Sequence, residues 1–538
     1  MQQIFSKLLK TLTRFCNGLI FCAAPLLTAG LLAESYLSMP RPLLAWIAFI
    51  PFAFAILRIK TPFFSFLYAF AAGLFSYIGI IYWIYPTVEF GTGSGGLALV
   101  SLISLSAVLA LQFGLFGFLC NYLKHVKWLF PISAACAWVS LELLHQFIAY
   151  KLAAFPWFVL GYTQAGATAL IQISSYGGVY GVSFLIMFFS LSFAAAVNDK
   201  TPSRARLAYL IAAPLLVATA FAFGRNIIAE QQYFLNSNPQ KISVALMQPD
   251  THKLMLEGYE GEVMLKIEEQ AAALGNRNID LIIWPESSYP GSFQNKDYED
   301  FIKQLSAKTQ AVQITGSYAA QNDKDFVSAG LFDKDGLKDI YNKVKLVPFG
   351  EFLPLNDLLK SLYEKYGIAS FTGTFAAGDE PGKLFGLTLP RENQNEKNFL
   401  FGAQICFESL FPSIWRAQAS NGAQFFVNIS NDGWFLNSAA PYQHLRANIF
   451  RSVENRRPLL RAANTGISAW IDSSGRMEYE SQLGQQETAV LDFEFQPQAA
   501  KTFYTKYGDV FAYICIFITL NIFIYSAVFL DATVYHRK

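Results

Sequence analysis

Charged residues are scarce in this chain of 538 residues: they make up 15% of it, whereas soluble globular proteins are about a quarter charged. The deficit is concentrated before about Ile227 and after about Val510. This distribution argues against a wholly soluble protein and indicates bilayer-embedded ends around a water-soluble middle. The formal net charge of +2 gives no electrostatic reason to expect a nucleic acid partner.

Cysteine and histidine are also few, with six and five residues. Cys406 is the one cysteine of the soluble middle, and the other five lie in apolar runs, where a cysteine usually behaves as a small hydrophobe. The chain has no CxxC pair, so neither a disulfide framework nor a zinc site is indicated. The histidines are too scattered for a metal cluster. The soluble middle has no GxGxxG or P-loop pattern, and we expect no cofactor.

Long apolar runs, in contrast, are abundant. A helix needs about 20 largely apolar residues to cross a hydrocarbon core about 30 Å thick. The first run follows basic residues, as in a signal peptide, but six further runs come after it within residues 1–227, so we expect a retained helix. Residues 1–227 are predicted to form a membrane domain of about seven spans, and residues 508–531 a final span. The runs are Phe15–Leu32, Leu43–Leu57, Phe63–Tyr85, Gly95–Tyr122, Leu129–Ala149, Val182–Val197, Leu207–Gly224 and Val510–Leu530.

Basic residues in the short loops predict the orientation, since they are enriched on the cytoplasmic side of a membrane. With both termini in the cytoplasm, the basic residues of alternate loops fall on the same side, whereas the opposite loops are poorer in basic residues and loop 86–94 carries none. The soluble middle is then on the outer, periplasmic face. The basic residues are Lys7, Lys10, Arg14, Arg58, Lys60, Lys124, Lys127, Lys200, Arg204, Arg206, His536, Arg537 and Lys538.

The middle of the chain, residues 240–496, alternates short β-rich runs with amphipathic helices, which indicates one α/β domain. Between the spans, Phe155–Gln164 (FPWFVLGYTQ) is either an interfacial loop with aromatic anchors or part of a lipid-substrate cleft. The expected strands are Ile242–Met247, Leu281–Trp284, Val312–Tyr318, Gly330–Phe332, Phe399–Ile405, Phe425–Ile429 and a hairpin over 469–480. The expected helices are Glu260–Leu274 and Tyr442–Glu454.

Three segments carry residues suited to catalysis: WPES at Trp284–Ser287, YNKVKLVPFGEFLP at Tyr341–Pro354 and QICFES at Gln404–Ser409. The first and third lie at strand ends, where catalytic groups are often mounted. They supply Glu286, Lys343 and Cys406. Each signal is weak alone, because a cysteine in a β run is usually core, and a glutamate or lysine in a loop is usually solvated.

Together these three residues make an acyl-transfer site without a metal. A neighbouring ammonium favours the thiolate, the nucleophilic form of cysteine, and a carboxylate can accept the thiol proton. The fixed Lys343 ammonium can stabilise the oxyanion that forms when sulfur attacks an acyl carbonyl. The acyl group then rests on Cys406 as a thioester, and Glu286 can next take a proton from an incoming amine.

These segments, with NISNDGWF at 428–435 and RPLLRAANTG at 457–466, resemble the nitrilase superfamily and, over nearly the whole chain, the apolipoprotein N-acyltransferases of Gram-negative bacteria. The resemblance implies a multi-span α-helical membrane bundle plus a nitrilase-like α/β domain, an αββα sandwich. It implies transfer of a fatty acyl chain from a phospholipid to the α-amino group of the N-terminal S-diacylglyceryl-cysteine of an apolipoprotein, in the inner membrane. We expect a monomer.

By position, the family's catalytic glutamate, lysine and cysteine match Glu286, Lys343 and Cys406. A second essential glutamate matches Glu351, which could hold Lys343 in place. A carboxylate after the nucleophile matches Glu408, which is either functional or structural. A substrate-gating tryptophan matches Trp434. The sequence departs from the family at Phe407, where tyrosine is frequent, at Leu436, where glycine is frequent, and over Gln248–Gly258, where a tryptophan is missing.

Two other functions share parts of this pattern. A membrane-anchored amidase would use the same three residues with water as acceptor, but would not need so large a helical part. A lipid-binding or transport protein with an inactive enzyme domain would not need the three residues intact, and transporters usually place charges within their spans. A run after Glu351, comprising Leu355, Leu358, Leu359, Leu362, Tyr363 and Tyr366, is either an amphipathic arm over the thioester or a core-facing helix.

Overall fold

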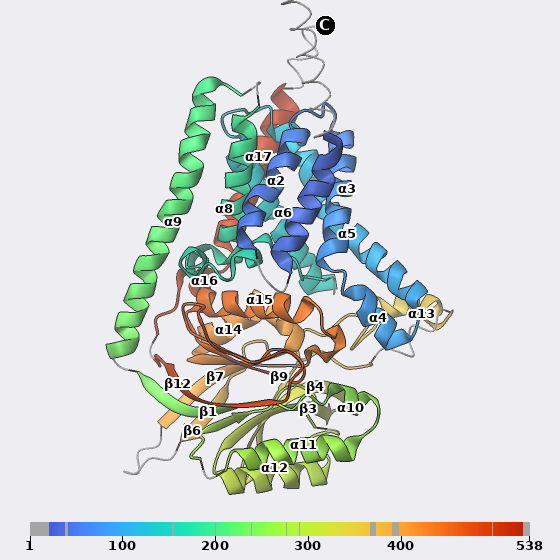
Figure 1. Ribbon diagram of the computed structural model, residues 1–538, viewed down its shortest axis with the longest axis vertical. Coiled ribbons are helices and arrows are strands. Elements are labelled where there is room, and N and C mark those ends of the chain that lie inside the picture. Colours follow the sequence, from blue (N-terminus) through green and yellow to red (C-terminus); the bar gives the residue numbers. More distant parts are fainter. Residues whose placement is uncertain are drawn as a thin grey trace, which may run out of the picture.

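The computed structural model describes residues 21–37, 41–152, 155–198, 201–237, 239–275, 277–289, 291–365, 373–389, 397–497 and 499–530. A bundle of apolar helices stands on a sandwich of two sheets (Figure 1). Some predictions lie partly or wholly outside the described residues: the start of the span Phe15–Leu32, and the basic residues Lys7, Lys10, Arg14, Lys200, His536, Arg537 and Lys538.

Among the described residues, six helices are long and apolar enough to cross a membrane, and two shorter apolar helices, Phe21–Tyr36 and α2, accompany them. All but the last of these helices precede the first strand. The bundle comprises α2 (Pro42–Ile56), α3 (Pro62–Ile80), α4 (Ile84–Thr92), α5 (Gly95–Leu123), α6 (Phe130–Leu152), η1 (Leu160–Gln164), α7 (Thr168–Ile171), α8 (Ser174–Ala196), α9 (Ser203–Ser237) and α17 (Val510–Tyr525), which continues as η5 (Ser526–Leu530).

Two helices are longer than the apolar runs that predicted them. Helix α8 begins at Ser174, before the predicted Val182, and passes through a kink at Gly178, whose φ is 62°. Helix α9 has 35 residues, which is about 52 Å at 1.5 Å per residue and exceeds a hydrocarbon core of about 30 Å. It therefore continues past the bilayer and delivers the chain to the edge of the sandwich (Figure 1).

Small residues let the helices of the bundle pack closely. A Cβ on Gly117 of α5 would lie 2.4 Å from the Ala69 Cβ of α3, and a Cβ on Gly224 of α9 would lie 1.7 Å from the carbonyl oxygen of Ala169. Any larger side chain there would push the helices apart. Because lipid is as apolar as the helices, this packing, rather than exclusion from water, holds a membrane bundle together.

Two six-stranded sheets form the sandwich. The first has the order β12-β1-β2-β3-β4-β5 and the second β11-β10-β9-β8-β7-β6. The strands are β1 (Gln240–Gln248), β2 (Leu281–Ile283), β3 (Val312–Gln321), β4 (Lys324–Asp333), β5 (Gly336–Asn342), β6 (Phe385–Leu389), β7 (Lys397–Ile405), β8 (Phe425–Ser430), β9 (Leu459–Ala463), β10 (Ala469–Ile471), β11 (Met477–Glu480) and β12 (Glu487–Phe495).

Helices cover both outer faces, so the predicted αββα sandwich is confirmed (Figure 1). Alternation along β1 shows the layering: Val244 and Leu246 join the core between the sheets, and Ala245 and Met247 join the core beneath α11 and α12. Helices α14 and α15 lie between the second sheet and the bundle. The remaining elements are α10 (His252–Leu256), α11 (Glu260–Ala273), α12 (Lys296–Thr309), α13 (Asn356–Lys365), η3 (Cys406–Leu410), α14 (Pro412–Asn421), η4 (Asp432–Phe435), α15 (Ala440–Asn455) and α16 (Phe503–Tyr507).

Candidate active site

Each of the three predicted catalytic residues follows a strand. Glu286 comes three residues after β2, and Lys343 and Cys406 come directly after β5 and β7. The two sheets thus supply the site jointly. Glycine is required beside Glu286, because a Cβ on Gly316 of β3 would lie 2.6 Å from the Glu286 Cα. All three side chains are buried.

Lys343 lies between two carboxylates. Its Nζ is 2.9 Å from Glu286 Oε1 and 2.6 Å from Glu351 Oε1. Burial alone would lower the pKa of Lys343, but the two carboxylates outweigh it and hold that pKa well above its usual value. Lys343 therefore stays an ammonium. Lys345, the neighbouring cation, instead donates to the Tyr150 carbonyl at the end of α6, at 2.9 Å.

Backbone groups fix both carboxylates. The Asn431 N–H donates to Glu286 Oε2 at 3.1 Å, and the Val347 N–H donates to Glu351 Oε2 at 2.8 Å. Burial raises the pKa of Glu351, and Lys343 opposes the rise. Two carboxylates around one ammonium leave an excess of negative charge, which a proton delivered from a neighbouring thiol would neutralise.

Cys406 occupies a strained elbow, the turn at which strand β7 ends and helix η3 begins. It is the first residue of η3, and its φ of 49° lies in the left-handed region that residues with a side chain rarely adopt. Burial raises the pKa of its thiol, the Glu286 carboxylate adds to the rise, and Lys343 opposes it. Lys343 thus favours the thiolate, as the sequence argument expects, but burial and the Glu286 carboxylate outweigh it and hold the pKa of the Cys406 thiol above its usual value.

Glu408 ties the segment of Lys343 to the segment of Cys406. Its Oε1 accepts hydrogen bonds from the Tyr341 hydroxyl at 2.9 Å and from the N–H groups of Val344 and Lys345 at 2.6 and 3.2 Å. Its Oε2 accepts from the Ile405 N–H at 2.8 Å. Burial raises the pKa of Glu408 to about 7. Of the two roles left open by the sequence, these contacts favour the structural one.

The segment after β8 lies across the site from Lys343. Asn431, whose N–H holds Glu286, also contacts His252 Nδ1 through its side chain at 3.0 Å. Trp434, on η4, is 44% exposed, and its ring centroid is 4.8 Å from that of His252. Trp434 is thus an exposed aromatic ring three residues from Asn431, whose N–H holds Glu286.

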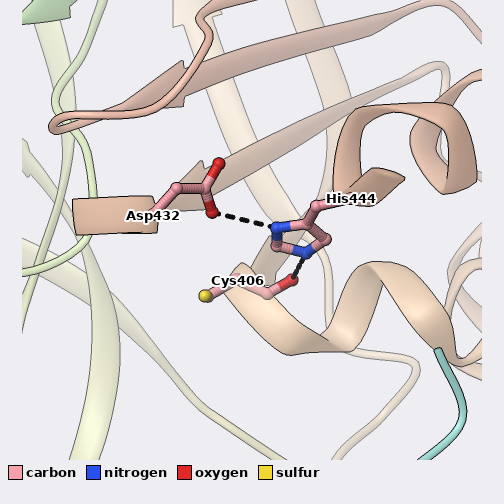
Figure 2. A group of neighbouring side chains, drawn as sticks. All are labelled: Cys406, Asp432 and His444. Carbon is pink, nitrogen blue, oxygen red and sulfur yellow. Dashed lines mark hydrogen bonds and ion pairs between the residues drawn. The ribbon is translucent and has the colours of Figure 1, made fainter. Parts of the chain in front are cut away.

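Sequence reasoning missed a second buried group, which lies beside Cys406. His444, on α15, contacts Asp432 Oδ1 through Nδ1 at 2.9 Å and the Cys406 carbonyl oxygen through Nε2 at 3.0 Å (Figure 2). Arg461, on β9, donates to Asp432 Oδ2 at 2.7 Å. Asp432 and Arg461 lie within noted motifs, but nothing in the spacing shows that α15 brings a histidine between them and Cys406.

Donor atoms of Cys406, Asp432 and His444 lie within 4.8 Å of one another, close enough to consider a metal ion. The arrangement does not fit one. Both ring nitrogens of His444 are engaged, and the Cys406 Sγ points away from the imidazole (Figure 2). Burial would raise the pKa of Asp432, but Arg461 and His444 hold it well below its usual range, as in a hydrogen-bonded ion pair.

Known proteins resemble this chain over most of its length. A family model of the apolipoprotein N-acyltransferase N-terminal domain matches residues 28–192, and a model of carbon-nitrogen hydrolases matches residues 243–503. The apolipoprotein N-acyltransferase of Geobacter metallireducens is 34% identical, covering 91% of this chain and 92% of its own. That of Vibrio cholerae is 28% identical, covering 90% and 94%. Among solved structures, a Nesterenkonia amidase of the nitrilase superfamily has 18% identity and a TM-score of 0.34, covering 49% of this chain and 93% of its own.

These similarities correspond to the two parts of the structure. The match to the N-terminal domain model covers most of the apolar helices, and the match to the carbon-nitrogen hydrolase model covers the sandwich that carries Lys343. The site offers a thiol, a carboxylate and a fixed cation, which suit acyl transfer. The chain belongs to the apolipoprotein N-acyltransferase family, and it is a multi-pass bacterial membrane enzyme with a nitrilase-type domain.

Proposed function

We propose that this enzyme moves a fatty acyl chain from a phospholipid to the α-amino group of a diacylglyceryl-cysteine at an apolipoprotein N-terminus, through a thioester on Cys406. The observation that carries the proposal is the ammonium of Lys343 held between Glu286 and Glu351, with the charges of Glu286 and Lys343 acting on the Cys406 thiol. Glu286 serves as base and acid, and Lys343 as the oxyanion stabiliser.

In the first half-reaction, Glu286 accepts the thiol proton as Sγ attacks the ester carbonyl of the phospholipid. The carbonyl oxygen becomes an oxyanion beside Lys343. When it collapses, the carbon–oxygen bond of the ester breaks, Glu286 returns the proton to the departing lysophospholipid oxygen, and the acyl group remains on sulfur.

In the second half-reaction, the neutral α-amine of the acceptor attacks the thioester, and Glu286 takes the proton that the nitrogen loses. The carbon–sulfur bond breaks, an amide forms, and the sulfur regains its proton from Glu286. Glu351 orients Lys343 throughout, and Trp434 borders the path of the substrates.

Contact with the bundle explains how a lipid reaches the thiol. Rings from the membrane part lie against the catalytic side: Trp157 is 5.5 Å from His444, and Trp83 is 5.0 Å from Phe435, between ring centroids. Lifting a chain of about 16 carbons into water would cost on the order of 10 kcal/mol at about 0.8 kcal/mol per CH₂. A thiol mounted against the bundle avoids that transfer. Phe155–Gln164, which supplies Trp157, therefore suits the lipid-cleft role better than that of a plain anchor.

The arrangement of basic loops supports a periplasmic catalytic domain in the inner membrane. The Asn121 side chain donates to the Ile59 carbonyl at 3.0 Å, and the Tyr209 hydroxyl donates to the Lys127 carbonyl. These contacts gather three basic loops at one end of the bundle, where α9 starts, away from the sheets (Figure 1). By the bias of basic residues, that end is cytoplasmic.

Intact-mass analysis of the purified enzyme incubated with phospholipid tests the proposal. We expect an acyl adduct that hydroxylamine removes and that a diacylglyceryl-cysteine peptide discharges. Cys406→Ala should give no adduct, and Cys136→Ala, which changes a buried cysteine of α6, should give the wild-type adduct. Discharge by water as fast as by the peptide would instead favour an amidase, and an absent wild-type adduct would favour a lipid-binding protein with an inactive domain.

A further inference from the structure

The His444 imidazole controls the peptide bond that follows the nucleophile. We infer that His444 is a positioning residue: by holding the Cys406 carbonyl, it turns the Phe407 N–H toward the oxyanion that forms on the substrate. This inference rests on the proposed thioester chemistry, and adds to the Lys343 ammonium a backbone donor whose direction is set from α15.

The first step concerns the direction of the peptide. The described residues contain no cis peptide bond, so the Cys406 C=O and the Phe407 N–H point in opposite directions. The carbonyl oxygen is 3.0 Å from His444 Nε2, and the Sγ points away from the imidazole (Figure 2). The Phe407 N–H therefore lies on the same side of the backbone as the sulfur.

The second step concerns whether that N–H is available. Phe407 lies in the first turn of η3, where N–H groups have no acceptor within the helix. A reacting carbonyl carbon bonded to Sγ places its oxygen within a few bond lengths of the sulfur. An N–H on the same side of the elbow is positioned to donate to it, as oxyanion-stabilising groups do.

The third step concerns the rigidity of the imidazole. A carbonyl oxygen can only accept, so Nε2 carries the proton of this hydrogen bond. Asp432 holds Nδ1 from the opposite side, and Arg461 holds Asp432 while also donating to the Ile467 carbonyl at 3.1 Å. The Trp157 ring packs on the imidazole, with 5.5 Å between the ring centroids. His444, Asp432 and Arg461 are at most 1% exposed.

The fourth step concerns the strain at Cys406. Its φ of 49° is strained for a residue with a side chain, so the elbow tends to relax unless its surroundings hold it. The hydrogen bond from His444 acts directly on the peptide that would rotate. Without it, the Phe407 N–H can turn away from the reacting oxygen while the sulfur remains in place.

Two variants that replace His444 by an amide side chain distinguish control of the Cys406 carbonyl from a merely structural role of His444. In His444→Gln the amide nitrogen reaches the position of Nε2 and can still hold the Cys406 carbonyl. In His444→Asn it reaches the position of Nδ1 and keeps only the contact with Asp432. Two rates are measured for each purified full-length protein: acylation of Cys406 by phospholipid, from intact mass, and alkylation of Cys406 by iodoacetamide. Alkylation needs an accessible thiol but forms no oxyanion.

We expect His444→Asn to acylate about 100-fold more slowly, as on loss of one oxyanion donor, with alkylation within threefold of wild type. His444→Gln should acylate within about tenfold of wild type. His444→Phe, which fills the space without a donor, should behave as His444→Asn and replaces it if the latter does not fold. His125→Asn, on the exposed loop between α5 and α6, is the matched control.

Equal acylation rates in His444→Asn and His444→Gln would overturn the inference, as would a parallel fall in alkylation, which would indicate a merely structural role. A wild-type protein that forms no adduct at all, yet is alkylated at Cys406, would instead refute the proposed function.

Discussion

At the scale of single residues, the surroundings of Cys406 favour the neutral form of its thiol. Burial raises the pKa of Cys406, and the neighbouring Glu286 carboxylate raises it further. A neutral sulfur is poorly reactive toward oxidants and chance electrophiles, because the thiolate is the reactive form. In the proposed mechanism the thiol gives up its proton to Glu286 as sulfur attacks the substrate carbonyl, so a raised thiol pKa limits side reactions of the resting enzyme.

The raised pKa predicts how alkylation of Cys406 depends on pH. A free thiol has a pKa of about 8.5, so its thiolate fraction levels off above pH 9. For a thiol with a higher pKa, the thiolate fraction and the alkylation rate continue to rise about tenfold per pH unit through pH 9.5. Peptide mass spectrometry after timed iodoacetamide pulses reads this rate at Cys406, with the unfolded protein as control. A plateau below pH 8 would show a resting thiolate.

Leu436 predicts a gain in stability on substitution. Its φ and ψ of 52° and −154° lie in a region that glycine adopts freely, and its side chain is 38% exposed. Relief of about 1–3 kcal/mol of strain, less about 1 kcal/mol of added chain entropy, should make Leu436→Gly more stable by about 1 kcal/mol. Thermal unfolding in detergent measures the change. Leu436→Ala keeps the strain and should not gain, so an equal gain in both variants would contradict this explanation.

At the scale of elements, α13 follows Glu351 and presents apolar side chains outward. Leu355 and Leu358 are 61% and 76% exposed, whereas Tyr363 is buried and donates through its hydroxyl to the Pro354 carbonyl at 2.7 Å. The side chain of Leu362 and all of Tyr366 lie outside the described residues. The exposure of Leu355, directly before α13, and of Leu358, on it, favours the arm, whereas the buried Tyr363 marks the side of α13 that faces the domain.

Charges placed on α13 and at Leu355, the residue before it, test that arm. In Leu355→Asp/Leu358→Asp, entry of the helix into lipid becomes costly, so acylation of Cys406 by bilayer phospholipid should fall at least tenfold. Acylation by a short, water-soluble thioester should stay near the wild-type rate, because the thiol and Glu286 are unchanged. Leu265→Asp, on an exposed position of α11, is the matched control. Unchanged acylation from bilayers would remove the arm from the mechanism.

Elements with strong local signals could be predicted from the sequence, and elements defined by distant partners could not. The spans α5 and α6 and the strands β7 and β8 are long or continuous apolar runs, and their predicted bounds are nearly right. Strand β12 was not predicted from the sequence, because its burial comes from antiparallel pairing with β1, which is far away in the sequence.

The same distinction applies to the site. Glu286, Lys343 and Cys406 are recognisable because each stands in its own short motif at or near a strand end. His444 was not predicted as part of the site, because its contacts depend on how α15 packs against η3 and η4, and no local sequence pattern encodes this packing. The raised pKa of the Cys406 thiol could not be predicted for a related reason, since burial of the sulfur and the sharing of Lys343 between two carboxylates depend on the folded site.

At the scale of the whole molecule, the membrane part and the catalytic domain share one hydrophobic core. Residues of the bundle and residues around Cys406 belong to the same buried cluster, whereas the layer beneath α11 and α12 forms its own. Gln443, the neighbour of His444 on α15, links the catalytic domain to the helical bundle through four hydrogen bonds. Its Oε1 accepts from the indoles of Trp83 and Trp157 at 3.0 and 2.8 Å. Its Nε2 donates to the carbonyls of Tyr36 and Ile80 at 3.1 and 3.0 Å.

Removing this amide should loosen the two parts from each other. Gln443→Leu leaves two indole N–H groups and two carbonyls without their partner in a buried setting, and each such group costs about 1–3 kcal/mol. We expect a loss of about 3 kcal/mol or more, seen as a lower unfolding temperature in detergent. Trp157→Phe, which removes one of the four hydrogen bonds, should lose less, and Gln232→Leu on an exposed face of α9 should lose nothing measurable. If Gln443→Leu unfolds no earlier than Trp157→Phe, the boundary is held by apolar packing alone, and the amide serves only to orient the two indoles beside the nucleophile.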